Sequence, residues 1–203
     1  MTSTFRTAAA LAAVALSAPA SAQEHRPRLG IGVGISAFDF NSTLTLTNGF
    51  PAVIPDSIYV PINLGPNFRL EPQLGIMTLS QDTGGGGIAS TDTSVVSIGL
   101  GAFYLVDVAS QLDVYVGGRV VRTSYSQTLK SPGVPDDKTE GTDIRIIPAL
   151  GGEYSPHPRF SLGAEVQLQL VSFGKRTLSA GGEIPGGSGT QTAGLLFARV
   201  YLF

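Results

Sequence analysis

The chain has 203 residues, of which 42% are hydrophobic and 14% charged, with no cysteine and a formal net charge of −2. The lack of cysteine excludes disulfides, thiolate chemistry and cysteine-based zinc sites, and the slightly acidic balance excludes a basic surface for nucleic acid. The 26 glycines and 13 prolines disfavour a helical bundle. High apolar content with little charge predicts a membrane protein whose apolar residues are dispersed along the chain.

Residues 1–22 have the features of a secretory signal peptide. Arg6 supplies the positive n-region, residues 8–18 supply the apolar core, and Ala20-Ser21-Ala22 forms a small-residue cleavage pattern. The apolar run is shorter than the roughly 20 residues that a membrane-spanning helix requires. We therefore expect export, cleavage after Ala22, and one folded domain over residues 23–203.

The segment LGIGVGISAF, residues 29–38, allows two interpretations. Its glycines fit G-x-G-x-x-A, the fingerprint of a dinucleotide-binding turn, which requires a helix directly afterwards. The sequence that follows, DFNSTLTLTNGFP, has no helical period and contains the hairpin signal Asn48-Gly49. A strand with one apolar face and one nearly bare face is therefore favoured.

Alternation of apolar with polar or small residues marks seven segments, and an eighth segment, residues 193–203, is apolar on both faces. Together they predict eight strands. Each strand is close to the roughly 9–11 residues of a tilted membrane strand. Their centres fall within residues 29–36, 58–64, 68–76, 96–106, 112–120, 143–154, 161–170 and 193–203.

The connectors between these strands alternate in length. Those after the second, fourth and sixth strands are short, at 65–66, 107–111 and 155–159, whereas the others are longer, at about 41–55, 80–91, 129–141 and 172–190. Such alternation is typical of outer-membrane barrels, which have short periplasmic turns and long outer loops. The predicted fold is an all-β, eight-stranded antiparallel up-and-down transmembrane β-barrel with short periplasmic turns and long extracellular loops.

The polar face of this barrel carries charges that would lie in the lumen. An eight-stranded barrel is only wide enough for side chains to fill it, so these charges must pair. Folding the strands about their connectors places Arg119 opposite Gly151 and diagonal to Glu153, which makes Arg119–Glu153 the expected bridge. A structural network is favoured over an ion path or a proton relay. The predicted network comprises Arg69, Glu71, Asp113, Arg119, Asp143, Arg145, Glu153 and Glu165.

Aromatic residues on the apolar face gather next to the short turns and the C-terminus, which predicts a periplasmic aromatic girdle at the membrane interface. Its members are Phe68, Tyr104, Tyr154, Phe160, Tyr201 and Phe203.

Four residues disturb this pattern. Pro61, Pro72 and Pro148 fall inside strands and each removes a ladder hydrogen bond, so bulges or strand ends are expected there. Arg199 shares the parity of Tyr201 and Phe203, which predicts that it faces lipid close to the interface and extends toward the headgroups, unless a bulge resets the strand.

The sequence offers little for catalysis. His25 lies in a short basic tail and His157 in a predicted periplasmic turn, and neither has a serine and a carboxylate at triad spacing. Calcium at Asp82 with Asp92, or at Asp136-Asp137, lacks the spacing of an EF-hand loop. We expect no enzyme activity, no cofactor and no metal.

The eight alternating segments, the loop asymmetry and the ending Tyr201-Leu202-Phe203 resemble the small outer-membrane barrels of the OmpA transmembrane domain and OmpX/Ail type. This resemblance implies a monomer in the bacterial outer membrane, in contact with its lipid and lipopolysaccharide. It also implies recognition of Phe203 by the barrel-assembly machinery and a possible host or surface ligand at the loops. The implied function is a non-enzymatic structural or adhesive barrel. A narrow channel is the alternative, and a lipid A-modifying enzyme or a soluble periplasmic barrel is less favoured.

Overall fold

The computed structural model describes residues 29–39, 57–85, 88–131, 133–179 and 182–202, and the predicted signal peptide lies outside them. All regular structure in these ranges is β-strand, and no helix in them has the length and hydropathy needed to cross a membrane. The strands are β1 (Gly30–Asp39), β2 (Ser57–Tyr59), β3 (Ile62–Asn63), β4 (Phe68–Gly85), β5 (Ile88–Ala109), β6 (Leu112–Ser131), β7 (Val134–His157), β8 (Phe160–Leu178), β9 (Glu183–Ile184) and β10 (Gly187–Tyr201).

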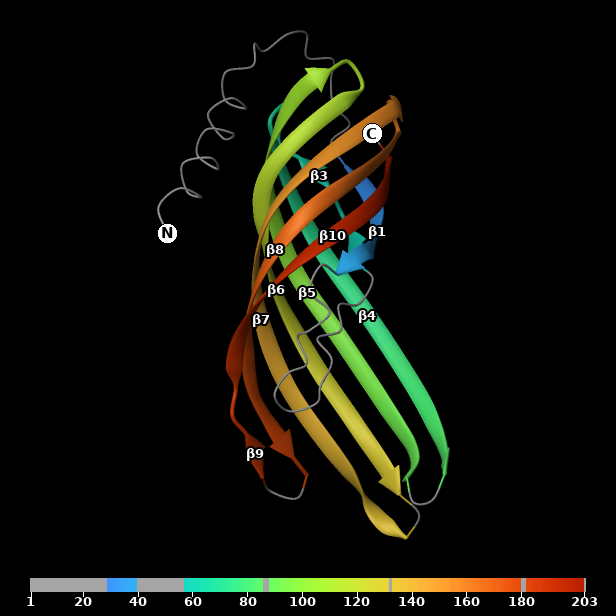
Figure 1. The fold of residues 1–203 in the computed structure, drawn as a ribbon. Coiled ribbons are helices and arrows are strands. Elements are labelled where there is room, and N and C mark those ends of the chain that lie inside the picture. The colour runs from blue at the N-terminus through green and yellow to red at the C-terminus, as the bar shows by residue number, and fades with distance from the viewer. Residues whose placement is uncertain (1–28, 40–56, 86–87, 132, 180–181, 203) are drawn as a thin grey trace.

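The strands form a closed antiparallel ring with eight positions (Figure 1). Strands β4 to β8 pair in chain order, and β10 pairs with both β8 and β1, which closes the ring. The short strands β2 and β3 both pair with β4 and together occupy one position, while β9 is a two-residue addition to β8. The ring confirms the predicted all-β, eight-stranded up-and-down architecture.

The strands are much longer than the membrane requires, which the sequence pattern did not predict. Strands β4 to β8 contain 18, 22, 20, 24 and 19 residues, against about 9–11 for one crossing. The connectors predicted as long loops at 80–91 and 129–141 are mostly strand, because the ladders of β4–β5 and β6–β7 continue into them. Figure 1 shows these long hairpins at the end opposite the short turns. The predicted loop at 41–55 lies outside the described residues.

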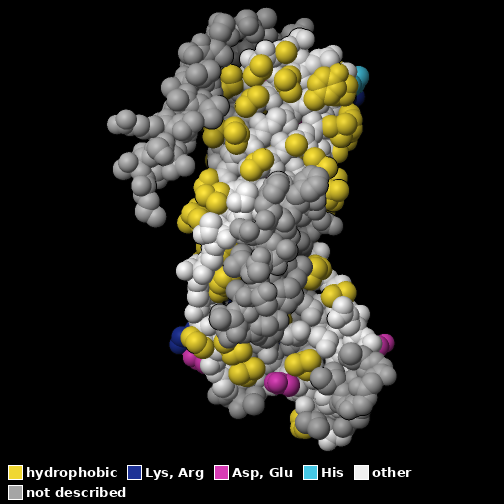
Figure 2. Space-filling model, in the orientation of Figure 1, with side chains coloured by type: hydrophobic (Ala, Val, Ile, Leu, Met, Phe, Trp, Pro, Cys, Tyr) yellow, Lys and Arg dark blue, Asp and Glu magenta, His cyan; other side chains and the backbone are white. Residues whose placement is uncertain are grey.

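Apolar side chains cover the outside of the half nearest the short turns. On β6 the outward positions from Leu112 to Val120 are apolar or glycine, a span of nine residues. Beyond this belt the outward residues of the long strands are mostly polar, and on β6 the first of them is the exposed Arg122. Figure 2 shows the apolar side chains spread over this half, and the visible Asp and Glu side chains at the other end. The first hydroxylic positions on the outward face are Thr78, Ser94, Ser124, Thr142, Ser172 and Thr192.

The strand register differs from the expected one by even numbers of residues. Arg119 lies opposite Ile147 rather than Gly151, because the β6–β7 ladder ends with Ser131 opposite Val134, ahead of Pro135. Glu165 lies opposite Gly151 rather than Ala149. Because successive side chains point to opposite faces, an even shift keeps every side chain on its expected face and changes only its neighbours.

The three prolines are accommodated where pairing is interrupted or one-sided. Pro61 separates β2 from β3, and its carbonyl accepts a hydrogen bond from the Gly30 N–H at 3.0 Å. Pro72 lies beside the end of β2, and its carbonyl accepts from the Val60 N–H at 2.9 Å. Pro148 falls at a gap in the β7–β8 pairing, between Ile146 and Ala149.

Candidate functional site

The lumen contains six ionised side chains that are almost completely buried. All are 3% exposed or less, and they project from β4, β6, β7, β8 and β10. Burial of so many charges is unfavourable unless each is paired and hydrogen-bonded. The six residues are Arg69, Glu71, Arg119, Glu153, Glu165 and Arg199.

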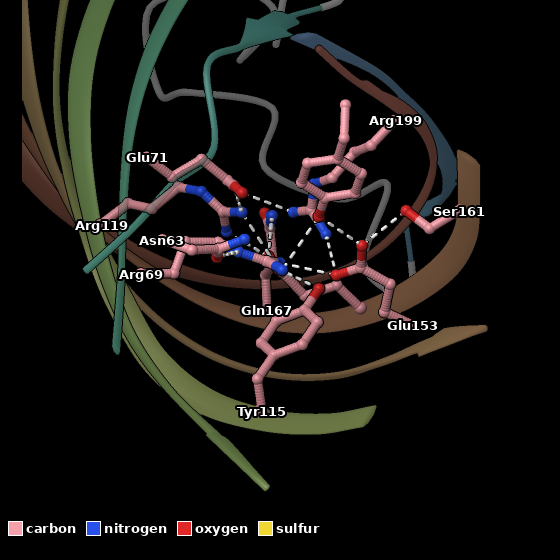
Figure 3. Close-up of polar contacts among 11 residues, drawn as sticks. Asn63, Arg69, Glu71, Tyr115, Arg119, Glu153, Ser161, Gln167 and Arg199 are labelled. Atoms are coloured by element: carbon pink, nitrogen blue, oxygen red, sulfur yellow. Dashed lines mark hydrogen bonds and ion pairs between the residues drawn. The ribbon is translucent and has the colours of Figure 1, made fainter. Parts of the chain in front are cut away.

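These six residues form one continuous row of ion pairs with alternating charge, which we call the charge chain. Figure 3 labels its members other than Glu165. Its order is Arg69, Glu153, Arg199, Glu71, Arg119 and Glu165. The nitrogen–oxygen distances along it are 2.6, 2.7, 2.5 and 2.6 Å, and it ends in the contact of Arg119 with Glu165. Three arginines and three glutamates make the charge chain neutral, and it links five strands across the lumen.

Neutral side chains complete the hydrogen bonding at both ends of the charge chain. Glu153 Oε1 accepts from Ser161 Oγ at 2.5 Å and from the Tyr201 hydroxyl at 2.7 Å. Arg69 donates from Nε to Asn63 at 2.9 Å and from Nη2 to the Tyr201 hydroxyl at 3.0 Å. These partners replace the water that an exposed carboxylate or guanidinium would bind, which offsets part of the desolvation cost.

Glu165, at the other end, has a similar set of donors. Its Oε2 accepts from the Tyr115 hydroxyl at 2.8 Å, and its Oε1 accepts from Gln167 Nε2 at 2.7 Å. Gln167 in turn accepts from Gln169 Nε2 at 3.0 Å. Figure 3 shows the labelled polar groups converging inside the ring of strands.

Aromatic rings enclose the two central arginines. The Arg119 guanidinium lies 4.6 Å from the centre of the Phe103 ring and 5.1 Å from that of Tyr59. The Arg199 guanidinium lies 3.9 Å from the centre of the Phe197 ring. A cation over the face of an aromatic ring is stabilised by the ring quadrupole. The same rings keep water away from the pairs, which strengthens them.

Two sequence predictions on β10 are wrong. Arg199 was expected to face lipid, yet it is 1% exposed and lies in the charge chain. Tyr201 was expected in the aromatic girdle, yet its hydroxyl contacts Arg69 and Glu153 inside the lumen. The physical reason is that the inward face of β10 also carries Leu195 and Phe197, so hydropathy does not distinguish its two faces.

The remaining predicted lumen residues have other partners. Asp143 forms a two-fold ion pair with Arg176 at 2.8 and 2.9 Å, nearer the long hairpins, and the sequence analysis did not single out Arg176. Arg145 is buried, whereas Asp113 is half-buried beside the short turns. The expected Arg119–Glu153 bridge does not form, because the shifted register brings Arg119 to Glu71 and Glu165 instead.

The predicted girdle residues other than Tyr201 lie as follows. Phe68, Tyr154 and Phe160 are exposed on the outward face near the short turns, and Tyr104 is half-buried. The Phe68 and Tyr104 rings meet edge to face, with centres 5.3 Å apart. The Tyr154 hydroxyl donates to Gln111 at 3.1 Å. Phe203 lies outside the described residues.

The candidates for catalysis or metal binding are not brought together. His157 Nδ1 accepts from the backbone N–H of Arg159 at 3.2 Å, within the turn. Asp92 binds Lys130 at 2.8 Å and Ser80 at 2.5 Å, and these two donors lower the pKa of its carboxyl. In the described part of the chain, no three His, Cys, Asp or Glu side chains are placed to hold a metal ion. His25 is outside that part.

The sequence was also compared with known families and structures. Residues 7–194 match the family described as the outer membrane protein beta-barrel domain. The chain belongs to this family. Membership places the protein in the bacterial outer membrane and, with the orientation typical of such barrels, its short turns on the periplasmic side.

Solved outer-membrane proteins have the same fold. Ail, the attachment invasion locus protein of Yersinia pestis, is 12% identical, with a TM-score of 0.51 over 88% of this chain and 100% of Ail. A major outer membrane protein from Thermus thermophilus is 12% identical, with a TM-score of 0.52 over 88% of this chain and 100% of that one. At such identities the likeness shows the fold alone. A comparison with curated proteins gave no match.

Proposed function

We propose that this member of the outer membrane barrel family is a non-enzymatic structural barrel that presents its long hairpins as an interaction surface. The observation that carries the proposal is the charge chain, which occupies the lumen and leaves the hairpins as the part of the protein available to partners. The proposal also takes the protein as a monomer in contact with outer-membrane lipid and lipopolysaccharide, recognised through Phe203 during assembly.

The charge chain favours this function over a narrow channel. An ion or solute that crossed the lumen would have to separate ion pairs whose members are all 3% exposed or less. Removing one partner of such a pair typically costs about 3–5 kcal/mol. Planar-bilayer recordings of the purified barrel, with an open porin as the positive control, test this. We expect no conductance steps, and reproducible steps from the wild-type protein would favour the channel.

The charges on the hairpins restrict the chemistry of a surface partner. One solved structure of Ail, 11% identical to this chain with a TM-score of 0.52, contains a heparin analogue, sucrose octasulfate. Here the described hairpins carry an acidic surplus, and their lysines pair with carboxylates at 2.5 to 3.0 Å. We therefore propose a neutral or cationic partner rather than a polyanion. Apart from the buried pair of Asp143 and Arg176, the charged residues are Asp82, Asp92, Asp136, Asp137, Glu140 and Glu183, with Lys130, Lys138 and Lys175.

Shortening the hairpins tests the surface role directly. Ser126 and Glu140 are paired across β6 and β7, so a two-residue Asn-Gly turn can replace residues 127–139. The pairing of β6 with β7 between this new turn and the membrane then stays unchanged. Folding is checked by the different gel mobilities of unboiled and boiled samples. We expect adhesion of the expressing bacteria to host cells or matrix to fall with this variant, and with matching variants of the other two described hairpins. Unchanged adhesion after all three are shortened would contradict the proposal.

A lipid A-modifying activity is tested separately. The mass spectrum of lipid A is compared between cells that overproduce the protein and cells that lack it. We expect identical spectra, and a new lipid A species that depends on the protein would reassign it as an enzyme.

A further inference from the structure

A small cavity lies in the lumen on the side of the charge chain nearer the long hairpins. Its volume is about 30 Å³, and Arg119 belongs both to its wall and to the charge chain. Further along the same strands its wall includes Thr123 on β6 and Arg145 on β7. The amide side chains of Gln73 on β4 and Gln169 on β8 also line the cavity.

Buried polar atoms without a hydrogen-bond partner gather around this cavity. Among the described residues they include Gln73 Oε1, Gln169 Oε1, Thr123 Oγ1 and Arg119 Nε, and all four residues line it. These residues are between 1 and 8% exposed. Most buried polar groups in proteins have a partner, and four without one at a single place indicate that a ligand satisfies them.

The four atoms identify the ligand by their hydrogen-bonding character. The guanidinium Nε–H of Arg119 can only donate, the Thr123 hydroxyl can donate, and the two glutamine Oε1 atoms can only accept. Water matches this set because it both donates and accepts. A halide accepts only and would leave both amide oxygens unsatisfied. A metal cation would lie beside the positive charges of Arg119 and Arg145.

We propose that this cavity is a buried hydration site that holds two water molecules. One water molecule requires a cavity volume of about 10–15 Å³, so the 30 Å³ of this cavity accommodates about two. The two waters connect Gln73, Thr123 and Gln169 to Arg119, and so link β4, β6 and β8 just outside the charge chain. This inference does not depend on the proposed function, because it concerns the lumen whatever the hairpins bind.

A crystal structure of the refolded barrel, grown in sodium bromide and measured at the bromine absorption edge, tests the ligand. We expect two water peaks in the cavity, within hydrogen-bond distance of Arg119 Nε and of the two glutamine oxygens, and no anomalous signal. A bromide peak there would make it an anion site, and a cavity without density would make it dry. Either result would overturn the proposal.

Nuclear magnetic resonance of the barrel in nanodiscs tests the same site in a bilayer. Wild-type protein should show water cross-peaks to the side-chain amides of Gln73 and Gln169. Thr123→Val replaces a hydroxyl with a methyl group of similar size and should reduce these cross-peaks at least two-fold. Thr139→Val is the matched control, since Thr139 is also buried but does not line the cavity. Absence of the wild-type cross-peaks, or equal cross-peaks in both variants, would overturn the proposal.

Discussion

Replacing Glu71 with glutamine removes one negative charge from the middle of the charge chain and nearly preserves the shape of the side chain. The Glu71 carboxylate accepts from Arg119 at 2.6 Å and from Arg199 at 2.5 Å, and the residue is 0% exposed. A glutamine has one acceptor oxygen instead of two, and its NH₂ group would face a guanidinium that also can only donate.

The expected loss is large because the variant leaves an uncompensated charge in a closed lumen. Three buried arginines would face two carboxylates, and removing one partner of a buried pair costs about 3–5 kcal/mol. Glu71 contacts two arginines, so we expect a loss of about 5 kcal/mol in the free energy of unfolding, at the upper end of that range. The two contacts share one group, and their energies do not simply add.

Urea unfolding of the barrel in lipid vesicles measures this loss, followed by circular dichroism and gel mobility because the chain has no tryptophan. Glu140→Gln is the matched control, since Glu140 pairs with Lys138 in an exposed position where such a pair contributes little. The double variant Glu71→Gln with Arg199→Gln should lose less than the sum of its single variants, because it restores neutrality. A loss below about 1 kcal/mol for Glu71→Gln would refute the reasoning.

Three further predictions concern the barrel wall, β10 and a hairpin. Gly117→Ala should lower the free energy of unfolding by about 1–3 kcal/mol, because the added Cβ would lie 2.1 Å from the backbone carbonyl oxygen of Ala102. Gly152→Ala is the control: its Cβ would lie 3.8 Å from the carbonyl oxygen of Asp113, so the free energy of unfolding in urea should change little. Arg199→Met should lose about 3–5 kcal/mol in the same assay, and a more stable variant would contradict its inward position. The pKa of Asp92 is lowered by its hydrogen bonds from Lys130 and Ser80, so the hairpin contact persists above the ordinary carboxyl pKa and is lost as pH falls through the lowered value. A carbon-13 titration of the carboxyl should show this low pKa, and Lys130→Ala should raise it.

Sequence periodicity was sufficient for the fold class because a pleated strand alternates its faces whatever its exact register. The predicted register between β6 and β7 was wrong by four residues, yet the Arg119 side chain points into the lumen as predicted. Turn positions set the register, and the low-complexity connectors carried no signal strong enough to locate them. The long hairpins were missed for a related reason, since hydroxylic strands outside a membrane lack the apolar alternation that identifies strands inside it.

The candidate site was only partly accessible to such reasoning. Glu71 and Glu153 lie on strands with one clearly polar face, where alternation is easy to follow. Arg199 and Tyr201 lie on β10, whose inward residues Leu195 and Phe197 pack against lumen side chains and look like lipid-facing ones. Hydropathy cannot distinguish an apolar residue that packs inside a barrel from one that contacts lipid.

The sequence by itself determined that every strand except β10 has an apolar face and a polar or small-residue face, and the all-β barrel in the outer membrane follows from that alternation. Only the tertiary structure decided which arginine meets which carboxylate. Arg69 and Glu71 lie on β4, whereas Glu153 is 84 residues from Arg69 and Arg199 is 128 residues from Glu71 in sequence. Ring closure brings them together across the lumen, and the distances that result depend on every turn in the ring rather than on any local pattern.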